Sequence, residues 1–286
     1  AYDKALDVYY LAIAYCSAMR NWRDPVAFSA ARGLYLYRLV GVTLFELLHW
    51  RWLLLVFPNT FEYFFIAYEA VRTRWNPLRL GAVAVLGMVV GIWVVVKLPQ
   101  EWWIHIAKLD FTEFMAERPY MWGVLTAAAA TAAVFGWRSR SRIPATNWPF
   151  TTDVTRHLGE LPPTAPGRVF GLLLVEKVVF IALVSVIFAQ ILPQVRASNL
   201  GIIVGVAAII VINTLLSQWL ARRGTEWSSI LKEFVVISGM NLGIILVAAF
   251  LLPSIDWSIN LRNTLFMVPL WTLNITLYDR YRRMHN

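Results

Sequence analysis

The sequence predicts an all-α integral membrane protein, a polytopic helical bundle of about eight transmembrane helices. Hydrophobic residues make up 59% of the 286 residues, and charged residues make up only 15%. An average soluble domain contains roughly 25% charged residues, so this composition is typical of a chain surrounded by lipid. The apolar residues also gather in runs of roughly 20, which is the helical length that crosses a bilayer.

Eight apolar runs have this length. They cover residues 30–49, 52–71, 78–97, 119–137, 168–192, 199–220, 233–252 and 261–278. The first two form one continuous stretch that Trp50, Arg51 and Trp52 divide, and such a mixture of charge and aromatic rings is typical of a membrane interface. If residues 30–71 instead make one pass with a re-entrant piece, the protein has seven spans.

Two segments outside these runs predict interfacial amphipathic helices. Residues 1–26 contain the Tyr-rich run DVYYLAIAYCSAM, which is too short to span and favours a helix along the cytoplasmic surface. A truncated additional span is the alternative for this segment. Residues 99–119 are bracketed by prolines and mix tryptophans with acidic residues, which indicates an amphipathic helix on the outer surface.

The predicted organisation is two membrane halves joined by a linker. Its five parts are a cytoplasmic or interfacial segment 1–26, a four-helix half 27–137 that includes the outer helix 99–119, a basic Pro-rich cytoplasmic linker 138–167, a second four-helix half 168–279, and a basic cytoplasmic tail 280–286. The linker begins with RSRSR and contains five prolines, which break regular structure.

The distribution of Lys and Arg predicts the orientation. With both termini in the cytoplasm, eighteen of the 26 basic residues fall on the cytoplasmic side and six on the other side. This asymmetry satisfies the positive-inside rule and predicts a multi-pass protein of the cell membrane. The net charge of +9 is then accounted for by topology and by anionic lipid headgroups on the cytoplasmic side, and nucleic acid is not an expected partner.

A carboxylate near the middle of a predicted span is the strongest functional signal. Glu62 lies eleven residues into the run 52–71, and Glu69 lies two turns further along the same face. Pro58 removes a backbone donor and Asn59 can bond the loosened backbone, so we expect a bend beside Glu62. A carboxylate beside such a bend can bind a cation or relay a proton. The alternatives are a buried structural ion pair and a protonated Glu62.

Other charged residues within the runs are predicted partners of this site. Charge in the hydrocarbon is costly, so such residues usually face the protein interior and pair. Cross-span pairs of Arg38 with Glu176, or of Lys177 with Glu62, would neutralise the set. The predicted polar path comprises Asn59, Glu62, Glu69, Arg38, Glu176 and Lys177.

A metal site near the outer interface is a second hypothesis. Glu46 and His49 are three residues apart on one helix face, which is the geometry of a Glu-x-x-His half-site in helical bundles. Glu101 and His105, four residues apart, would supply further ligands. The alternative is a hydrogen-bonded cluster at the outer interface, and the sequence assigns no other cofactor.

Three glycine pairs predict close helix packing, within the chain or with a partner. They have small-xxx-small spacing in the third, sixth and seventh runs: Gly87 with Gly91, Gly201 with Gly205, and Gly239 with Gly243. Glycine at this spacing lets helix backbones approach closely in a membrane.

Three classes of function are compatible with these features. The leading one is a transporter or channel-like protein that moves an ion or small solute along a polar path containing intramembrane carboxylates. The second is a non-catalytic structural or assembly subunit of a larger membrane complex, with a membrane-protein partner or a second copy of the chain. The third is a membrane-embedded enzyme acting on a lipid or isoprenoid. The sequence has no phosphate-binding glycine loop, GxSxG or HExxH motif, and no catalytic residue is assigned.

Overall fold

The computed structural model describes residues 2–154, 171–191, 199–222, 230–251 and 261–285. Throughout these ranges the protein is all-α, and they contain no β-strand. All eight predicted apolar runs form helix over most of their length, so the predicted fold class is confirmed at this level. The part of the predicted linker beyond residue 154 lies outside the described ranges.

The chain divides into two compact units that differ from the predicted halves. One unit consists of Ala1–His49 and Glu160–Asn286, and the other of Trp50–Gly159. The predicted halves are 27–137 and 168–279, and they group the run 30–49 with the runs that follow it in sequence. In the structure the first two helices instead pack against helices near the C-terminus, which only tertiary contacts can reveal.

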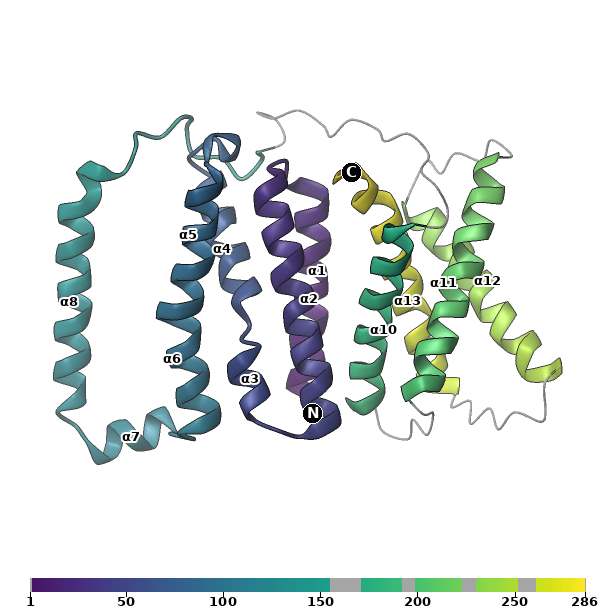
Figure 1. Cartoon of the computed structure of the whole chain (residues 1–286), viewed down its shortest axis with the longest axis horizontal. Helices are drawn as coiled ribbons and strands as arrows, with labels where there is room; N and C mark the ends of the chain where they lie inside the picture. The colour runs from purple at the N-terminus through teal and green to yellow at the C-terminus, as the bar shows by residue number, and fades with distance from the viewer. Residues whose placement is uncertain (1, 155–170, 192–198, 223–229, 252–260, 286) are drawn as a thin grey trace. The chain divides into compact units, whose positions relative to one another are not determined.

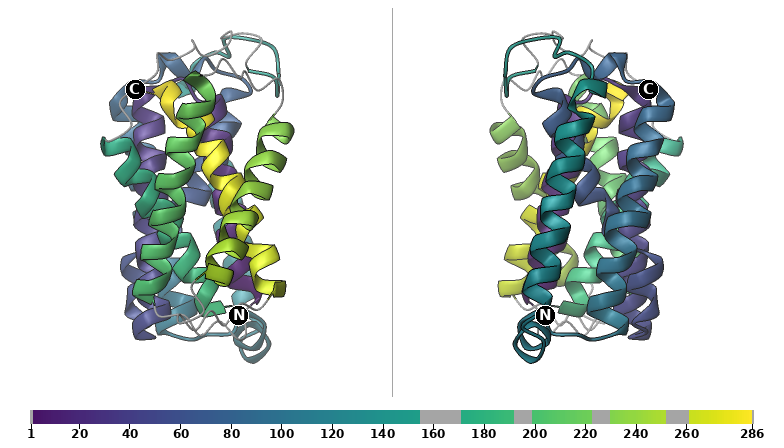
Figure 2. Two further views of the ribbon diagram at one scale, coloured as in Figure 1. Left: turned by 90° about the vertical axis from the view of Figure 1, so that its right-hand side faces the viewer. Right: turned by 90° about the vertical axis from the view of Figure 1, so that its left-hand side faces the viewer.

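In its described ranges the first unit contains six long helices and a terminal 3-10 turn. They are α1 (Tyr2–Asn21), α2 (Pro25–Leu48), α10 (Leu172–Ile191), α11 (Asn199–Arg222), α12 (Ile230–Leu251), α13 (Leu261–Tyr281) and the 3-10 helix η5 (Arg282–His285). Helix α1 contacts α2, α10 and α13, and α10 also contacts α2 and α13 (Figure 1). Helix α11 packs on α10 and α12 on α13 (Figure 2).

Aromatic side chains form the core where α1, α2 and α10 meet. Tyr15 and Tyr35 stack with ring centroids 4.5 Å apart, and the Phe180 ring meets them edge-on at 5.9 and 5.6 Å. All three side chains are almost completely buried. Edge-to-face and offset rings stabilise a core beyond the area they bury.

Helix α1 buries one face against the rest of the first unit, and its predicted position along the membrane surface stays a prediction. Leu11, Ala18, Met19 and Trp22 in and just after this helix are fully buried within the first unit, while Ile13 is exposed. Helix α2 then begins at once, because Asp24 accepts a hydrogen bond from the Val26 N–H at 2.9 Å and Pro25 occupies the first helical position.

The second unit is built around one broken helix and one long helical run. Its elements are α3 (Trp52–Val56), α4 (Thr60–Arg72), the 3-10 helix η1 (Pro77–Arg79), α5 (Ala82–Gly91), the π-helix η2 (Ile92–Lys97), α6 (Leu98–Glu101), the π-helix η3 (Trp102–Ile106), α7 (Phe111–Glu117), α8 (Met121–Ser139) and the 3-10 helix η4 (Arg140–Arg142). Helices α3 and α4 pack along the run formed by α5 to η3.

The predicted single helix over 99–119 is wrong. Helix continues without interruption from Ala82 to Ile106, passing through Pro99 between two π-helical stretches. The wider π turn accommodates a residue that has no N–H to donate. A separate helix, α7, starts after Asp110, whose carboxylate accepts from the Thr112 and Glu113 N–H groups at 2.8 and 3.2 Å. The Thr112 hydroxyl, followed by these two backbone donors, lowers the pKa of Asp110.

The described part of the linker, residues 143–154, is irregular and packs on the loop after α4. The Asn147 N–H donates to the Arg74 carbonyl and the Thr151 N–H to the Thr73 carbonyl, both at 3.1 Å. The Trp75 indole N–H donates to the Pro144 carbonyl at 2.9 Å. These bonds give the linker backbone partners that a helix would otherwise supply.

By length and apolar composition, the described ranges contain one helix able to cross a membrane, Ala82–Ile106. The pair Phe111–Glu117 and Met121–Ser139, bent by 113°, adds a second if it is one broken span. The structure therefore does not establish the eight predicted spans.

The predicted glycine contacts are not visible among the described residues. A Cβ atom placed on Gly87, Gly91, Gly205, Gly239 or Gly243 would meet no other atom within 4 Å, apart from near neighbours in its own helix. Gly201 is exposed near the start of α11. At the first five of these glycines the described chain leaves open space, and close packing of the glycine pairs stays a prediction.

Replacing Phe180 by Ala is expected to destabilise the first unit by about 3–5 kcal/mol, because the ring fills the aromatic core. Thermal or denaturant unfolding of the purified protein in detergent measures the loss. Val179→Ala on the same helix is the matched control, since Val179 is 43% exposed. Equal unfolding midpoints for the two variants would contradict the packing described here.

Candidate functional site

The candidate site lies in the second unit, where the helix breaks between α3 and α4. Pro58 has no N–H, so it cannot donate to the carbonyl of Leu54 as a helix requires. Helix α3 ends at Val56 and α4 begins at Thr60, whose N–H donates to the Pro58 carbonyl at 2.8 Å. The predicted break beside Glu62 is thus confirmed.

Three ionisable residues line up on the helical run that packs beside this break. Lys97, Glu101 and His105 are four residues apart and therefore share one helix face. The Glu101 carboxylate lies 3.6 Å from Lys97 Nζ and 3.0 Å from His105 Nε2. Side-chain exposure falls from 27% at His105 to 6% at Glu101 and 5% at Lys97. The face therefore leads from an accessible imidazole to a buried ion pair.

Glu101 also connects this face to the broken helix. Its Oε1 accepts from the backbone N–H of Asn59 at 3.4 Å, so it satisfies one of the donors left at the start of α4. Asn59 in turn donates from Nδ2 to Glu62 Oε2 at 2.8 Å. Asn59 is 5% exposed, and its Oδ1 is buried without a hydrogen-bond partner among the described residues.

The Lys97 ammonium has two further contacts that hold it in place. Nζ donates to Gln100 Oε1 at 2.8 Å and lies 4.4 Å from the centroid of the Tyr63 ring. A cation over an aromatic face is attracted by the ring quadrupole, most strongly where water is excluded. The ammonium is therefore positioned to neutralise Glu101 without reaching solvent.

The arrangement can accept one additional positive charge. Glu62 and Glu101 carry two negative charges, Lys97 carries one positive charge, and the N-terminus of α4 behaves as roughly +0.5. Counting these groups alone, the site retains about half a negative charge. Such a site can bind a cation or a proton and release it again.

Of the other residues in the predicted polar path, Glu69 lies in this unit and is half-buried. It pairs with Arg72 one turn later on α4, and Arg72 is buried. Arg38, Glu176 and Lys177 belong to the first unit. Arg38 is buried on α2.

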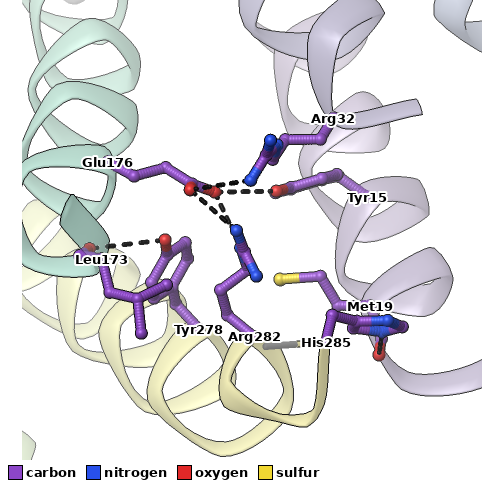
Figure 3. A network of polar contacts seen from close by, with 8 residues as sticks. All are labelled: Tyr15, Met19, Arg32, Leu173, Glu176, Tyr278, Arg282 and His285. Atoms are coloured by element: carbon purple, nitrogen blue, oxygen red, sulfur yellow. Dashed lines mark hydrogen bonds and ion pairs between the residues drawn. The ribbon is translucent and has the colours of Figure 1, made fainter. Parts of the chain in front are cut away.

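Glu176 is the centre of a charged network in the first unit (Figure 3). Arg282 donates to both of its oxygens, from Nε at 2.9 Å and from Nη2 at 3.0 Å. Arg32 adds a bond at 3.3 Å and the Tyr15 hydroxyl one at 3.5 Å. A bidentate arginine on a carboxylate is a strong, geometrically specific pair, so this network ties α10 to the end of α13.

The predicted basic tail 280–286 continues this network. The Nε2–H of His285 donates to the Met19 carbonyl at 2.7 Å (Figure 3). The His285 ring also stacks on Phe28, with centroids 3.8 Å apart. Burial lowers the pKa of His285, against the opposing effect of the Met19 hydrogen bond. The described tail is therefore folded onto α1 and α2.

Lys177 forms a second buried connection between α10 and α13. Its Nζ lies 2.8 and 3.0 Å from the two Asp279 oxygens and donates to the Thr214 hydroxyl at 2.8 Å. The pairs suggested by the sequence, Arg38 with Glu176 and Lys177 with Glu62, are wrong. Glu176 and Lys177 each find their partner on the last helix and the turn after it.

The four predicted metal ligands do not assemble into a site. His49 is exposed, caps the end of α2 with a positive φ of 55°, and stacks on Phe45. Of the set, the structure shows Glu101 and His105 paired with each other. The described ranges contain no group of three or more His, Cys, Asp or Glu side chains that could hold a metal ion.

Sequence reasoning missed Lys97, Asp279 and Arg282. The four-residue spacing of Lys97, Glu101 and His105 was a usable signal, because it places all three on one helix face. Asp279 and Arg282 gave no such signal, since their partners lie 102 and 106 residues away in the sequence.

The chain matches no protein-family model, no curated protein and no solved structure in the comparisons made with them.

Replacing Lys177 by Met is expected to destabilise the protein by about 3–5 kcal/mol, because it leaves the partly buried Asp279 carboxylate unpaired. Unfolding in detergent measures the change, and adding Asp279→Leu should recover much of it. Arg280→Gln is the control, since its pair with Glu233 is long, at 3.9 Å, and Arg280 is 37% exposed. The Arg280→Gln variant should lose less than about 1 kcal/mol of stability. Equal losses of stability in Lys177→Met and Arg280→Gln would contradict a stabilising role for the Lys177–Asp279 pair.

Proposed function

We propose that this chain is an integral membrane protein with eight spans that transports an ion or small solute through the site at the α3–α4 break. The observation that carries this proposal is a helix broken at Pro58 beside the buried Lys97–Glu101 pair. Discontinuous helices in a bilayer are tolerated where they line a cavity or a binding site.

Exposed apolar surface supports the membrane part of the proposal. Only 17% of the most apolar window of Ala82–Ile106 is buried within the structure, and no residue of α8 is buried. Side chains such as Phe135 and Val134 are 69% and 56% exposed. Burying an apolar side chain of this size stabilises by about 1.5–3 kcal/mol, so leaving many in water would cost about as much as a domain's whole stability. Lipid removes that cost.

Aromatic residues stand at both ends of α8, as expected for interface anchors. Trp122 and Trp137 are fifteen positions apart, or about 22 Å along the helix, a little less than the roughly 30 Å hydrocarbon core. The Arg140 guanidinium lies 3.8 Å from the centroid of the Trp137 ring. Rings and cations of this kind gather at the headgroup level.

The site suits transport because its polar groups form a continuous series from an accessible side chain to buried ones. His105 is accessible, Glu101 is one helical turn further in, and Asn59 links Glu101 to Glu62 on the opposite helix. A cation or proton moving between these carboxylates crosses from one helix to the other. The π turns that flank Glu101 give this segment a geometry common at functional sites.

A role as a subunit of a larger membrane complex is the second candidate. It rests on α8, which buries none of its residues and so presents a complete helix surface to lipid or to another helix. Gentle extraction followed by native mass measurement distinguishes the two functions, since a subunit should retain a stoichiometric partner.

Glu62→Gln and Glu101→Gln are each expected to lower ion flux at least tenfold, because each removes a negative charge from the path. Flux of the purified protein in liposomes, followed with ion-sensitive and pH-sensitive dyes, is the measurement. Glu117→Gln is the control, since the Glu117 side chain is 62% exposed. Full flux in both site variants would exclude this path, and absence of flux in the wild type would exclude transport of the ions tested.

Cysteine labelling tests whether α8 crosses the membrane, as the eight-span topology requires. Cys16 is the chain's sole cysteine, so Cys16→Ala provides a cysteine-free background. Glu113→Cys should react with an impermeant maleimide in intact cells, whereas Ala145→Cys should react only after permeabilisation. Both positions are exposed in the structure. Labelling of both from the same side would contradict a span between them.

A further inference from the structure

The amide of Asn59 provides an oxygen that accepts no hydrogen bond from the residues that the structure describes. Its Nδ2 donates to Glu62, which fixes the orientation of the amide, and Oδ1 remains buried without a hydrogen-bond partner among the described atoms. Asn59 is 5% exposed, so bulk water does not solvate this oxygen. A buried acceptor in this state is stabilised by any ligand that brings a positive charge or a donor.

Further oxygen ligands lie beside this amide. Glu62 is held against Asn59 by the same hydrogen bond, so its carboxylate and the free amide oxygen share one place in the fold. Pro58 has no N–H for the Leu54 carbonyl, so the break also frees backbone oxygen. Carboxylate, amide and carbonyl oxygens are the ligands of hard cations, and unwound helices in membranes supply them to alkali ions.

The charge of the site selects against divalent ions. Glu101 pairs with the Lys97 ammonium and Glu62 lies in the first turn of α4, whose N-terminus carries roughly half a positive charge. Counting these four charges, the site keeps about half a negative charge. One monovalent cation turns that balance to about half a positive charge, whereas a divalent ion would leave about 1.5 positive charges next to Lys97. Transition metals are also disfavoured, because no cluster of three or more His, Cys, Asp or Glu exists in the described ranges.

From this geometry we infer that the α3–α4 break binds one monovalent alkali cation, with Asn59 Oδ1 and the Glu62 carboxylate as side-chain ligands. Backbone carbonyls of the broken segment complete the oxygen shell. The inference rests on the proposed function, because it names the ion that the transport site takes.

The test is cation binding to the full-length protein, purified in detergent with N-methylglucamine as the only cation. Thermal stability and binding of radioactive sodium are followed while NaCl, KCl, LiCl, MgCl2, CaCl2 or N-methylglucamine chloride is added. At least one alkali ion should raise the melting temperature saturably. Equal ionic strength from the other salts should not.

Two variants at Asn59 identify the ligand. Asn59→Ala should weaken alkali-ion binding at least tenfold, whereas Asn59→Asp keeps an oxygen at this place and should bind as tightly as the wild type or more tightly. Asn147→Ala, at an exposed asparagine of the same unit, should bind like the wild type. If Asn59→Ala does not fold, the comparison of Asn59→Asp with the wild type still decides, because weaker binding to the aspartate would overturn the inference.

The results separate this inference from the proposed function. Saturable alkali-ion binding that depends on Asn59, without flux in liposomes, supports the site and contradicts transport. Proton flux in alkali-free buffer, without alkali-ion binding, supports transport and overturns the inference. Equal stabilisation by magnesium or calcium, or a wild type that responds to no alkali ion, also overturns it.

Discussion

A charge placed among apolar helices has to be met by donors or by opposite charge, and both units are organised by this requirement. In the first unit Arg282 donates two hydrogen bonds to Glu176. Lys177 donates to Asp279 and Thr214. In the second unit Glu101 is met by Lys97 and by a backbone N–H at a helix break. The contacts of Glu176 and Lys177 hold helices of the first unit together. The contacts of Glu101 in the second unit lie beside Asn59, whose Oδ1 has no hydrogen-bond partner among the described residues.

The helices of this protein are largely predictable from sequence, whereas their grouping is not. Apolar runs of about 20 residues report hydrogen-bonded helix directly, because no other local structure satisfies the backbone within lipid. Grouping depends on which faces meet, and the burial of Tyr15 and Trp22 against distant helices has no local signature. The helix end predicted near Pro99 is wrong, since π turns allow the helix to continue through this residue.

The candidate site was predictable where backbone chemistry determines it. Pro58 must break a helix, and the side chains of Asn59 and Glu62 follow at once, so the sequence located this part of the site. The facing helix was predictable in the spacing of Lys97, Glu101 and His105 but not in its placement, because the spacing does not say which helix this face packs against. Local periodicity does not show whether Glu101 contacts the helix break or a metal ion, because that depends on how the helices pack.

Because the chain is synthesised from its N-terminus, the charged residues of α10 are made long before their partners. Glu176 and Lys177 emerge 106 and 102 residues before Arg282 and Asp279, which pair with them. Until those residues have been synthesised, Glu176 and Lys177 lack their partners on the last helix and the turn after it. The contacts that join α10 to the C-terminal end of α13 therefore form only once the last helix is present.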